Sequence, residues 1–287
     1  MKPIFSKALI VGVEGGIGRA LYELLLPSYN AVYGTSRREQ DGEIFFQIDL
    51  SNDFTGLKKI PNSCNIAFIC AATTKIVDCE NDRVGSYAVN VTNTVKLVST
   101  LQDLGMFVVW LSSNAVFSGK RPFSGLDEPY MPLTEYGRQK AAAEREIIEL
   151  GGVAIIRLTK VLSKDTPLIA SWIKNLKNGE KIYSFSDSYF CPISLKFAID
   201  AIAKVGCNFK EGIFNISGSD DISYFDFARM LAINSCGGDD LVRPVNKAMM
   251  QSTMLFNGRF GSLDMSMTTS SLDIKPQLLT EVLADIM

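Results

Sequence analysis

The sequence predicts an α/β fold, in which a doubly wound parallel sheet is followed by a smaller carboxyl-terminal lobe. Several apolar runs in the first half of the chain are continuous, as expected of parallel strands that are covered on both faces. Segments with helical patterning separate these runs, which is the βαβ order of such a sheet. A glycine-rich turn follows the first run. The chain has 287 residues, of which 47% are apolar, so it can bury a substantial core.

The first βα unit is predicted from a short apolar run and an amphipathic segment. Residues 8–11 are four small or branched apolar residues, which is typical of a buried strand. Residues 19–26 form a helical pattern that Pro27 ends. Between them stands Gly12-Val-Glu-Gly15-Gly16-Ile17-Gly18.

That turn is the first candidate for ligand binding. Gly12 suits a tight turn, Gly15 a close backbone approach to a pyrophosphate, and Gly18 the packing of helix on strand. The free N–H groups at the helix start favour an anion there. The sequence therefore predicts a Rossmann-like dinucleotide site that includes Gly16 and Ile17. Its spacing is Gly-x-x-Gly-x-x-Gly, which differs from the ordinary fingerprint, and an ordinary glycine-rich βα turn is the alternative.

The second strand indicates which dinucleotide is bound. Residues 31–34 lead into Thr35-Ser36-Arg37-Arg38, with no acidic residue at the strand end. An acid here holds the ribose hydroxyls of NAD, whereas an arginine accommodates the 2′-phosphate of NADP. Arg37 and Arg38 therefore favour NADP(H), and NAD(H) stays as the alternative cofactor. The other interpretation of the two arginines is a solvated basic loop.

Two further strands place residues beside the expected cofactor. The strand at 44–48 leads into Asp49 and Leu50, where an acid can accept from the adenine amino group, although Asp49 also suits a helix cap. The run at 66–72 ends in Ala71 and Ala72, whose small side chains let a cofactor lie against the backbone.

A serine pair follows the next strand. Residues 107–111 run into Ser112 and Ser113. Ligands of a doubly wound sheet bind outside the carboxyl ends of its strands, so both serines are expected to point at the site. Serines at strand ends are also common turn formers, and only the tyrosine–lysine pair described next favours the functional interpretation.

A helix is predicted from Thr134, which can cap it, to the glycines at 151 and 152. Tyr136 and Lys140 are then four residues apart on one face. A tyrosine with an ordinary pKa of about 10 is a poor proton-transfer group near neutrality. A neighbouring ammonium and an oxidised nicotinamide ring should lower that pKa. A serine hydroxyl beside the tyrosine can hydrogen-bond a substrate carbonyl, and in reduction Tyr136 donates the proton.

Composition excludes several other functions. The net charge is −2 with no long basic block, so nucleic acid is not an expected partner. The chain has no histidine, which excludes Ser-His-Asp and Cys-His sites and disfavours a zinc site, so no metal is expected. The six cysteines are scattered without a Cys-x-x-Cys, as in reduced cytoplasmic proteins. Neither a signal peptide nor a membrane-spanning run appears, so the expected location is the cytoplasm, away from membranes.

Longer motifs extend over most of the chain. They are residues 70–80 with Tyr87-Ala-Val-Asn90, then 111–119, 212–218, 223–228 and 261–264. With these motifs the chain resembles an extended short-chain dehydrogenase/reductase, and within that group the dTDP-4-dehydrorhamnose reductase family of nucleotide-sugar reductases. The carboxyl-terminal matches are the more specific ones, because they lie outside the generic nucleotide fold.

The resemblance implies roles for particular residues. Ser113, Tyr136 and Lys140 take the family's catalytic places, and Asn90 matches an asparagine that helps fix the nicotinamide side. Asn114 and Arg259 fall at substrate-binding positions. The sequence departs from the family at Asn114, which replaces an aspartate, at Ala115, at 156–161 and after Arg259, where Phe260 replaces a proline. Because these positions lie close to the sugar in the family, the identity of the substrate stays open.

The predicted organisation places an NADP-binding domain at 1–158, to which 192–206 returns. Residues 159–287 mainly form the substrate-binding lobe, with helices near 169–176 and 224–233. Residues 186–192, Arg243 and Arg259 are candidates for contact with sugar and diphosphate, because arginine is well suited to phosphate.

The favoured function is an NADP-dependent reductase of a nucleotide-linked 4-keto-6-deoxy sugar. An epimerase or dehydratase of the same superfamily is the second interpretation, and a non-catalytic NADP-binding regulatory protein is the third. Fold alone does not decide among them. The expected partner is a nucleotide-diphosphate sugar, and the sequence leaves a homodimer open.

Overall fold

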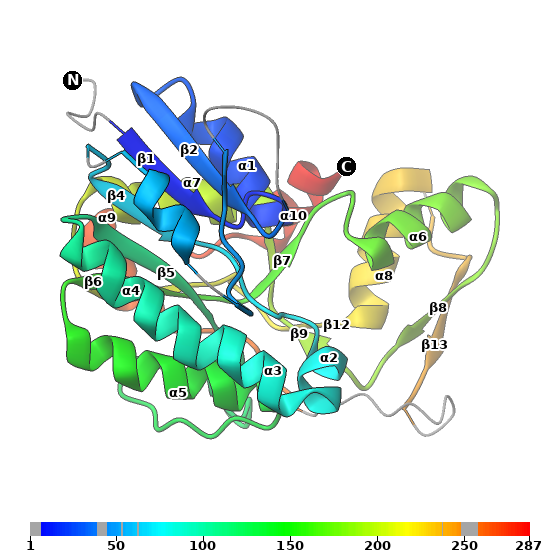
Figure 1. Cartoon of the computed structure of the whole chain (residues 1–287). Coiled ribbons are helices and arrows are strands. Elements are labelled where there is room, and N and C mark those ends of the chain that lie inside the picture. Colours follow the sequence, from blue (N-terminus) through cyan, green and yellow to red (C-terminus); the bar gives the residue numbers. More distant parts are fainter. Residues whose placement is uncertain (1–6, 39–44, 53, 62, 237, 248–257) are drawn as a thin grey trace. The chain divides into compact units, whose positions relative to one another are not determined.

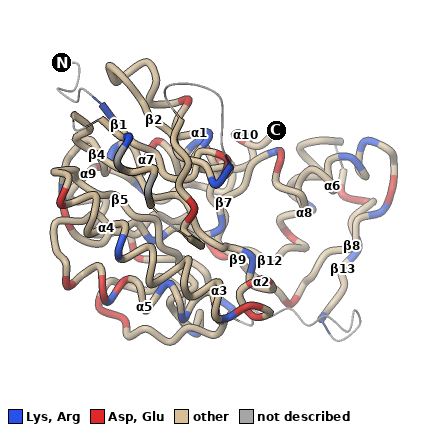
Figure 2. Tube along the Cα trace, viewed as in Figure 1, with Lys and Arg blue, Asp and Glu red and all other residues tan. Residues whose placement is uncertain are grey.

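The computed structural model describes residues 7–38, 45–52, 54–61, 63–236, 238–247 and 258–287 (Figure 1). These residues form two compact units. The first unit contains the chain up to Val116, Thr134–Arg157 and Ile199–Phe214, and the second contains Phe117–Leu133, Leu158–Ala198 and Asn215–Met287. The sequence predicted a boundary near residue 158 and a return of 192–206 to the first domain, whereas the units exchange segments at more points than these. Acidic and basic residues are interspersed along the described trace (Figure 2).

A seven-stranded sheet with the order β11-β6-β5-β4-β1-β2-β3 organises the first unit, and it confirms the predicted doubly wound parallel fold. The order reverses between β1 and β4, which makes the ends of these two strands the expected ligand site. Ile44, the first residue of the predicted third strand, lies outside the described residues. The strands are β1 (Lys7–Val11), β2 (Ala31–Ser36), β3 (Phe45–Gln47), β4 (Ile66–Ile69), β5 (Phe107–Ser113), β6 (Val153–Leu158) and β11 (Gly212–Ile216).

Helices cover both faces of this sheet. Ala67 and Ile69 of β4 join a buried cluster with residues of two helices, α4 and α5. Ile66 and Phe68 point to the other face, where Gly206 of α7 lies so close that a Cβ on it would be 2.6 Å from the Phe68 ring. The main helices are α1 (Gly16–Leu25), α4 (Asn93–Asp103), α5 (Glu135–Leu150) and α7 (Leu195–Cys207).

Shorter elements fill the connections of the first unit. They include a π-helical turn, η2, which is rare and often marks functional positions. These elements are the 3₁₀ turns η1 (Thr55–Lys59) and η3 (Asn114–Val116), the helices α2 (Ile76–Asn81) and α3 (Arg83–Tyr87), and η2 (Ala88–Thr92).

The second unit has its own apolar core, in which Trp172, Phe227 and Leu231 are buried. Three two-stranded sheets surround that core: β7 (Lys160–Leu162) with β10 (Pro192–Ser194), β9 (Tyr189–Phe190) with β12 (Ile222–Ser223), and β8 (Ile182–Phe185) with β13 (Val242–Val245). The helices are α6 (Pro167–Lys177), α8 (Tyr224–Cys236), α9 (Ser266–Leu272) and α10 (Leu279–Ile286). Within the described ranges, no helix of either unit is long and apolar enough to cross a bilayer.

Candidate active site

The end of β5 and the start of α5 bring Ser113, Tyr136 and Lys140 together. Ser113 is the last residue of the strand, and its hydroxyl is near enough to the Tyr136 phenol to act on the pKa of that phenol. The same hydroxyl accepts from the Ala115 N–H at 3.1 Å. Helix α5 starts at Glu135 because the Thr134 side chain accepts from the Gly137 N–H at 3.1 Å, which is the predicted cap. The Lys140 Nζ atom lies 6.0 Å from the centre of the Tyr136 ring, one turn along the same helix.

Burial controls the protonation of this cluster. It raises the pKa of Tyr136 to about 12, against the opposing effect of the Ser113 hydroxyl. Burial also lowers the pKa of Lys140 to about 8, although the nearby Glu144 carboxylate acts to raise it. The sequence predicted that Lys140 and an oxidised nicotinamide would together lower the Tyr136 pKa, whereas the protein's own groups raise it. Burial is the main reason for the rise. The Lys140 ammonium donates to the Leu111 carbonyl at 2.8 Å and lies 4.5 Å from the Trp110 ring.

The prediction that both serines point at the site is wrong for Ser112. Successive side chains of a strand point to opposite faces, so only Ser113 reaches Tyr136. The Ser112 hydroxyl instead donates to the Glu144 carboxylate, which forms a buried ion pair with Arg157 at 2.7 Å. The Glu144 carboxylate lies one turn of α5 beyond Lys140, and no sequence motif indicated this buried ion pair.

Asn90 connects the loop after β4 to α5. Its side-chain oxygen accepts from the Thr73 N–H at 2.8 Å, and its NH₂ group donates to the Thr73 carbonyl at 2.9 Å and to Gln139 Oε1 at 2.8 Å. Gln139 in turn donates to Ser86 Oγ at 2.8 Å. Asn90 therefore holds the backbone at Thr73, on the side where the sequence predicts the nicotinamide. Gln139, which precedes Lys140, was missed because a lone glutamine gives no sequence signal.

The glycine turn has the geometry that a close backbone approach needs. Gly12 has a φ of +93°, and a Cβ on it would lie 2.9 Å from Ala71, so the ends of β1 and β4 meet here. A Cβ on Gly18 would lie 2.2 Å from the Gly12 carbonyl oxygen, which explains why the helix packs on the turn only with glycine there. Gly16 is open, since a Cβ on it would meet nothing within 4 Å.

Helix α1 starts at Gly16, three residues earlier than predicted, with Gly15 as its N-cap. The N–H groups of a helix's first turn have no acceptor within the helix, and here they belong to Gly16, Ile17 and Gly18. An anion in front of this turn would meet those N–H groups and the positive end of the helix dipole. The residues present therefore fit the pyrophosphate of a dinucleotide.

The strand ends next to this turn carry the remaining predicted cofactor residues. Arg37 and Arg38 are exposed just after β2, and the turn is tied to the same strand end by the Gly12 N–H, which donates to the Thr35 carbonyl at 3.2 Å. Asp49 accepts from the Ser51 N–H at 2.9 Å, and although burial acts to raise its pKa, the Ser51 hydrogen bonds and the Arg37 charge lower it. Leu50 is buried. Ala72 follows Ala71 and is half-buried.

The predicted substrate residues divide between the units. Asn114 belongs to η3 in the first unit, directly after Ser113. Arg259 belongs to the second unit, where its guanidinium carbon lies 5.9 Å from the centre of the Tyr189 ring. Tyr189 lies within the predicted contact segment 186–192, so the structure joins two of the sequence candidates. Arg243 is on β13 and donates to the Val242 carbonyl at 3.1 Å.

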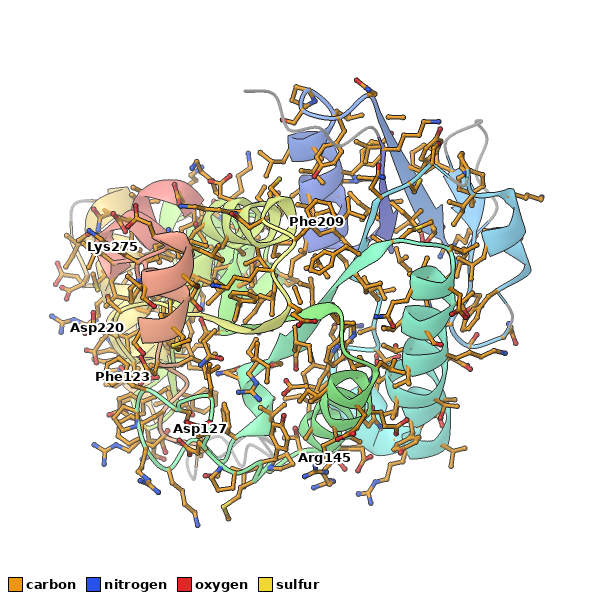
Figure 3. The ribbon with its side chains drawn as sticks, turned by 90° about the vertical axis from the view of Figure 1, so that its left-hand side faces the viewer. Phe123, Asp127, Arg145, Phe209, Asp220 and Lys275 are labelled. Atoms are coloured by element: carbon orange, nitrogen blue, oxygen red, sulfur yellow. The ribbon has the colours of Figure 1, made fainter. Side chains whose placement is uncertain are left out.

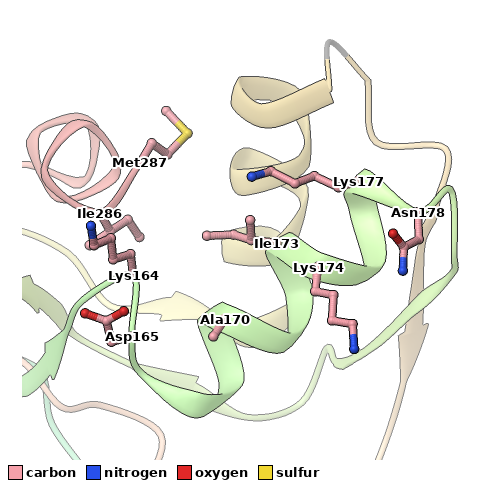
Figure 4. A pocket seen from close by; sticks show the side chains of 9 residues that line it. All are labelled: Lys164, Asp165, Ala170, Ile173, Lys174, Lys177, Asn178, Ile286 and Met287. Carbon is pink, nitrogen blue, oxygen red and sulfur yellow. The ribbon is translucent and has the colours of Figure 1, made fainter.

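The second unit also has a shallow cavity of about 400 Å³ beside α6 (Figure 4). None of the predicted substrate residues lines it, so it does not enter the candidate site. Its lining consists of Lys164, Asp165, Ala170, Ile173, Lys174, Lys177, Asn178, Ile286 and Met287. In the described part of the chain, no group of three or more acidic or cysteine side chains is placed to hold a metal ion.

Comparisons with known proteins show the family and the fold to which the chain is similar. The dTDP-4-dehydrorhamnose reductase of Aggregatibacter actinomycetemcomitans is 24% identical over 233 residues, which span 78% of this chain and 77% of that protein. The crystal structure of dTDP-4-dehydrorhamnose reductase from Bacillus anthracis in complex with NADP superposes with a TM-score of 0.85 at 22% identity, covering 99% of this chain and 98% of that one. DesIV, a dTDP-glucose 4,6-dehydratase from Streptomyces venezuelae with NAD bound, superposes with a TM-score of 0.79 at 19% identity, covering 98% and 95%. The model of the RmlD substrate binding domain matches residues 6–287. Since this match extends over nearly the whole sequence, the chain belongs to the RmlD substrate binding domain family.

Proposed function

We propose that the protein is an NADP(H)-dependent reductase of a nucleotide-linked 4-keto-6-deoxy sugar. The observation that carries the proposal is the cluster of Ser113, Tyr136 and Lys140 at the end of β5. A hydroxyl, a phenol and an ammonium in this order are suited to reducing a carbonyl. The relative from Aggregatibacter is named as a reductase of this kind, which supports the same substrate class.

The cofactor proposal depends on the first unit alone. The first turn of α1 offers its N–H groups to a pyrophosphate, and the open backbone at Gly16 leaves room for one. Arg37 and Arg38 directly follow β2, and no acidic residue stands at the end of the strand itself, which favours a 2′-phosphate. The Bacillus anthracis structure is described as a complex with NADP, in agreement with this preference. NAD(H) is the alternative cofactor, since DesIV holds NAD.

Each residue of the cluster has a separate task in the proposed reaction. A bound reduced nicotinamide supplies the hydride, which goes to the carbonyl carbon of the sugar. Ser113 donates a hydrogen bond to the carbonyl oxygen, and Tyr136 transfers its phenolic proton to that oxygen as the alcohol forms. Lys140 holds a positive charge beside the ring and stabilises the phenolate that remains.

Arg259 and Tyr189 are proposed to bind the nucleotide end of the substrate. A guanidinium can grip the two phosphates through several N–H groups at once. The Tyr189 ring beside it, 5.9 Å from the guanidinium carbon, limits the directions in which Arg259 can point.

The test is turnover with a panel of nucleotide 4-keto sugars and NADPH, comparing the wild-type protein with Tyr136→Phe. The phenylalanine keeps the ring and loses the proton, so we expect NADPH to bind equally while kcat falls by about 10²–10⁴-fold. Tyr183→Phe is the matched control, because this tyrosine is 61% exposed in the second unit, and it should leave kcat unchanged. If Tyr136→Phe keeps kcat within a factor of about two, well below the effect of a general acid, another group supplies the proton.

A further inference from the structure

The segment that carries Arg259 is fixed to the second unit at two points. On one side, the Gly119 carbonyl accepts from the Arg259 N–H at 3.0 Å and from the Phe260 N–H at 2.9 Å. Gly119 has a φ of +65°, and a Cβ on it would lie 2.5 Å from the Phe260 carbonyl oxygen. The backbone on this side of Arg259 therefore has little freedom to move.

On the other side, a single carboxylate holds the segment. Asp221 accepts from the Gly261 N–H at 2.5 Å, from the Ser262 N–H at 3.1 Å and from the Ser262 hydroxyl at 2.5 Å. Hydrogen bonds to an ionised carboxylate are stronger than neutral ones, so this is the tighter of the two attachments. Ser262 is buried, and its hydroxyl also accepts from the Phe123 N–H at 2.9 Å.

Asp221 also stands next to the strand that positions Tyr189. The residue after it, Ile222, starts β12, which pairs with β9 in the register Ile222–Phe190 and Ser223–Tyr189. The backbone of Asp221 thus leads into the partner strand of Tyr189, while its carboxylate holds the segment of Arg259. This one residue links the two members of the arginine–tyrosine pair, which are 70 positions apart in the sequence.

We propose that Asp221 is a positioning residue for substrate binding, which holds Arg259 over Tyr189 so that the guanidinium meets the diphosphate of a nucleotide sugar. This proposal rests on the function proposed above. A guanidinium binds phosphate best in a fixed orientation, and a segment free to shift would lose that advantage. Asp221 acts through the backbone of 259–262 and has no contact of its own with the substrate.

The test is the affinity for UDP and dTDP, which measures diphosphate binding without turnover. Asp221→Ala removes all three hydrogen bonds, and a charged hydrogen bond contributes enough that we expect affinity to fall about 10- to 100-fold. The affinity for NADPH should stay unchanged. Asp220→Ala is the matched control, because this neighbouring aspartate is exposed at the surface (Figure 3) and accepts only from Ser219 among the described hydrogen bonds. Equal affinities of Asp221→Ala and wild type would overturn the proposal.

A double variant separates positioning from a general loss of structure. If Asp221 acts through Arg259, then Asp221→Ala should add almost nothing in an Arg259→Ala background. Additive losses would overturn the proposal. Asp221→Asn keeps one oxygen acceptor for the two N–H groups, so it should show a smaller loss in the same direction and serves if the alanine variant does not fold.

The outcomes also separate this proposal from the proposed function. Wild-type protein that binds UDP or dTDP but reduces no nucleotide sugar would contradict the reductase and leave the role of Asp221 supported by its binding data. Wild-type protein that binds neither nucleotide would overturn the role of Asp221. In the enzyme assay, Asp221→Ala should raise KM for the nucleotide sugar while kcat changes little.

Discussion

Burial shifts the pKa values of Tyr136 and Lys140 in opposite directions. With its pKa raised to about 12, Tyr136 keeps its proton throughout the neutral range, as reduction requires. Lys140 is the opposite case, because burial lowers its pKa to about 8. A lysine with this pKa is charged at neutral pH and loses its charge within the range that an assay can reach.

A pH dependence of reduction follows from Lys140. Below about pH 8 the ammonium is present, and above that pH it becomes neutral and no longer stabilises a phenolate at Tyr136. We therefore expect kcat/KM for reduction to decline as the pH rises through about 8. The measurement is kcat/KM from neutral to alkaline pH, which reports the ionisations of the free enzyme. If kcat/KM stays constant as the pH rises and declines only where Tyr136 itself ionises, the charge of Lys140 is not required.

Arg37 and Arg38 lead to a prediction on cofactor choice. If they contact a 2′-phosphate, NADPH should bind more tightly than NADH, and charge-assisted contacts of about 1.5–3 kcal/mol imply a gap of at least tenfold. Replacing both with alanine should remove the gap by weakening NADPH alone. Lys174→Ala with Lys177→Ala removes two positive charges from α6 in the second unit and should leave the gap intact. Calorimetric titration showing equal affinities of the wild type for both cofactors would contradict the assignment.

Among the elements, α5 contributes most to the site. Its first turn presents Tyr136, its second Lys140 and its third Glu144, so one helix face holds the phenol proposed as proton donor, the ammonium and a buried carboxylate. Glu144 is fully buried and paired with Arg157 of β6. Its negative charge acts to raise the pKa of Lys140, against the lowering effect of burial. The helix thus sets both the position and the ionisation of its lysine.

Glu144→Gln tests this arrangement. Without the Glu144 carboxylate, burial should lower the pKa of Lys140 further. The decline of kcat/KM at alkaline pH should therefore move to lower pH. Thermal or denaturant unfolding should also show a loss of stability, since breaking a buried ion pair costs about 3–5 kcal/mol. Glu146→Gln, at an exposed position of the same helix, is the control for both measurements. A Glu144→Gln profile that coincides with wild type would mean that Glu144 serves only the packing of Arg157.

Sequence patterning predicted these elements well where a local signal exists. The strands β1, β4 and β5 are continuous apolar runs, and α5 has both a capping threonine and terminal glycines. Sequence patterning failed where the structure depends on contacts between residues that are distant in the sequence. The start of α1 was placed late because glycines carry no helical signal, and Ser112 was assigned to the site because a serine pair does not show which hydroxyl faces which side.

At the scale of the molecule, the sequence did not predict every exchange between the two units. Residues 199–214 lie in the first unit, to which the sequence analysis assigned 192–206, but 117–133, which come soon after β5, belong to the second unit without any sequence signal. No local pattern shows which core such a connection joins. No sequence pattern shows that Arg259 and Tyr189, both candidates for substrate contact, lie close together. The segment of Arg259 is attached to Gly119 and to Asp221.

The central claim is that the molecule transfers a hydride from NADPH to its substrate and releases the oxidised cofactor. The measurement is incubation of the wild-type protein with NADPH deuterated at the transferred position of the nicotinamide and a nucleotide 4-keto sugar, followed by mass spectrometry of the product. We predict one deuterium on the former carbonyl carbon for each NADP⁺ formed. Product that forms without deuterium and without loss of NADPH would contradict the account and indicate an epimerase or dehydratase.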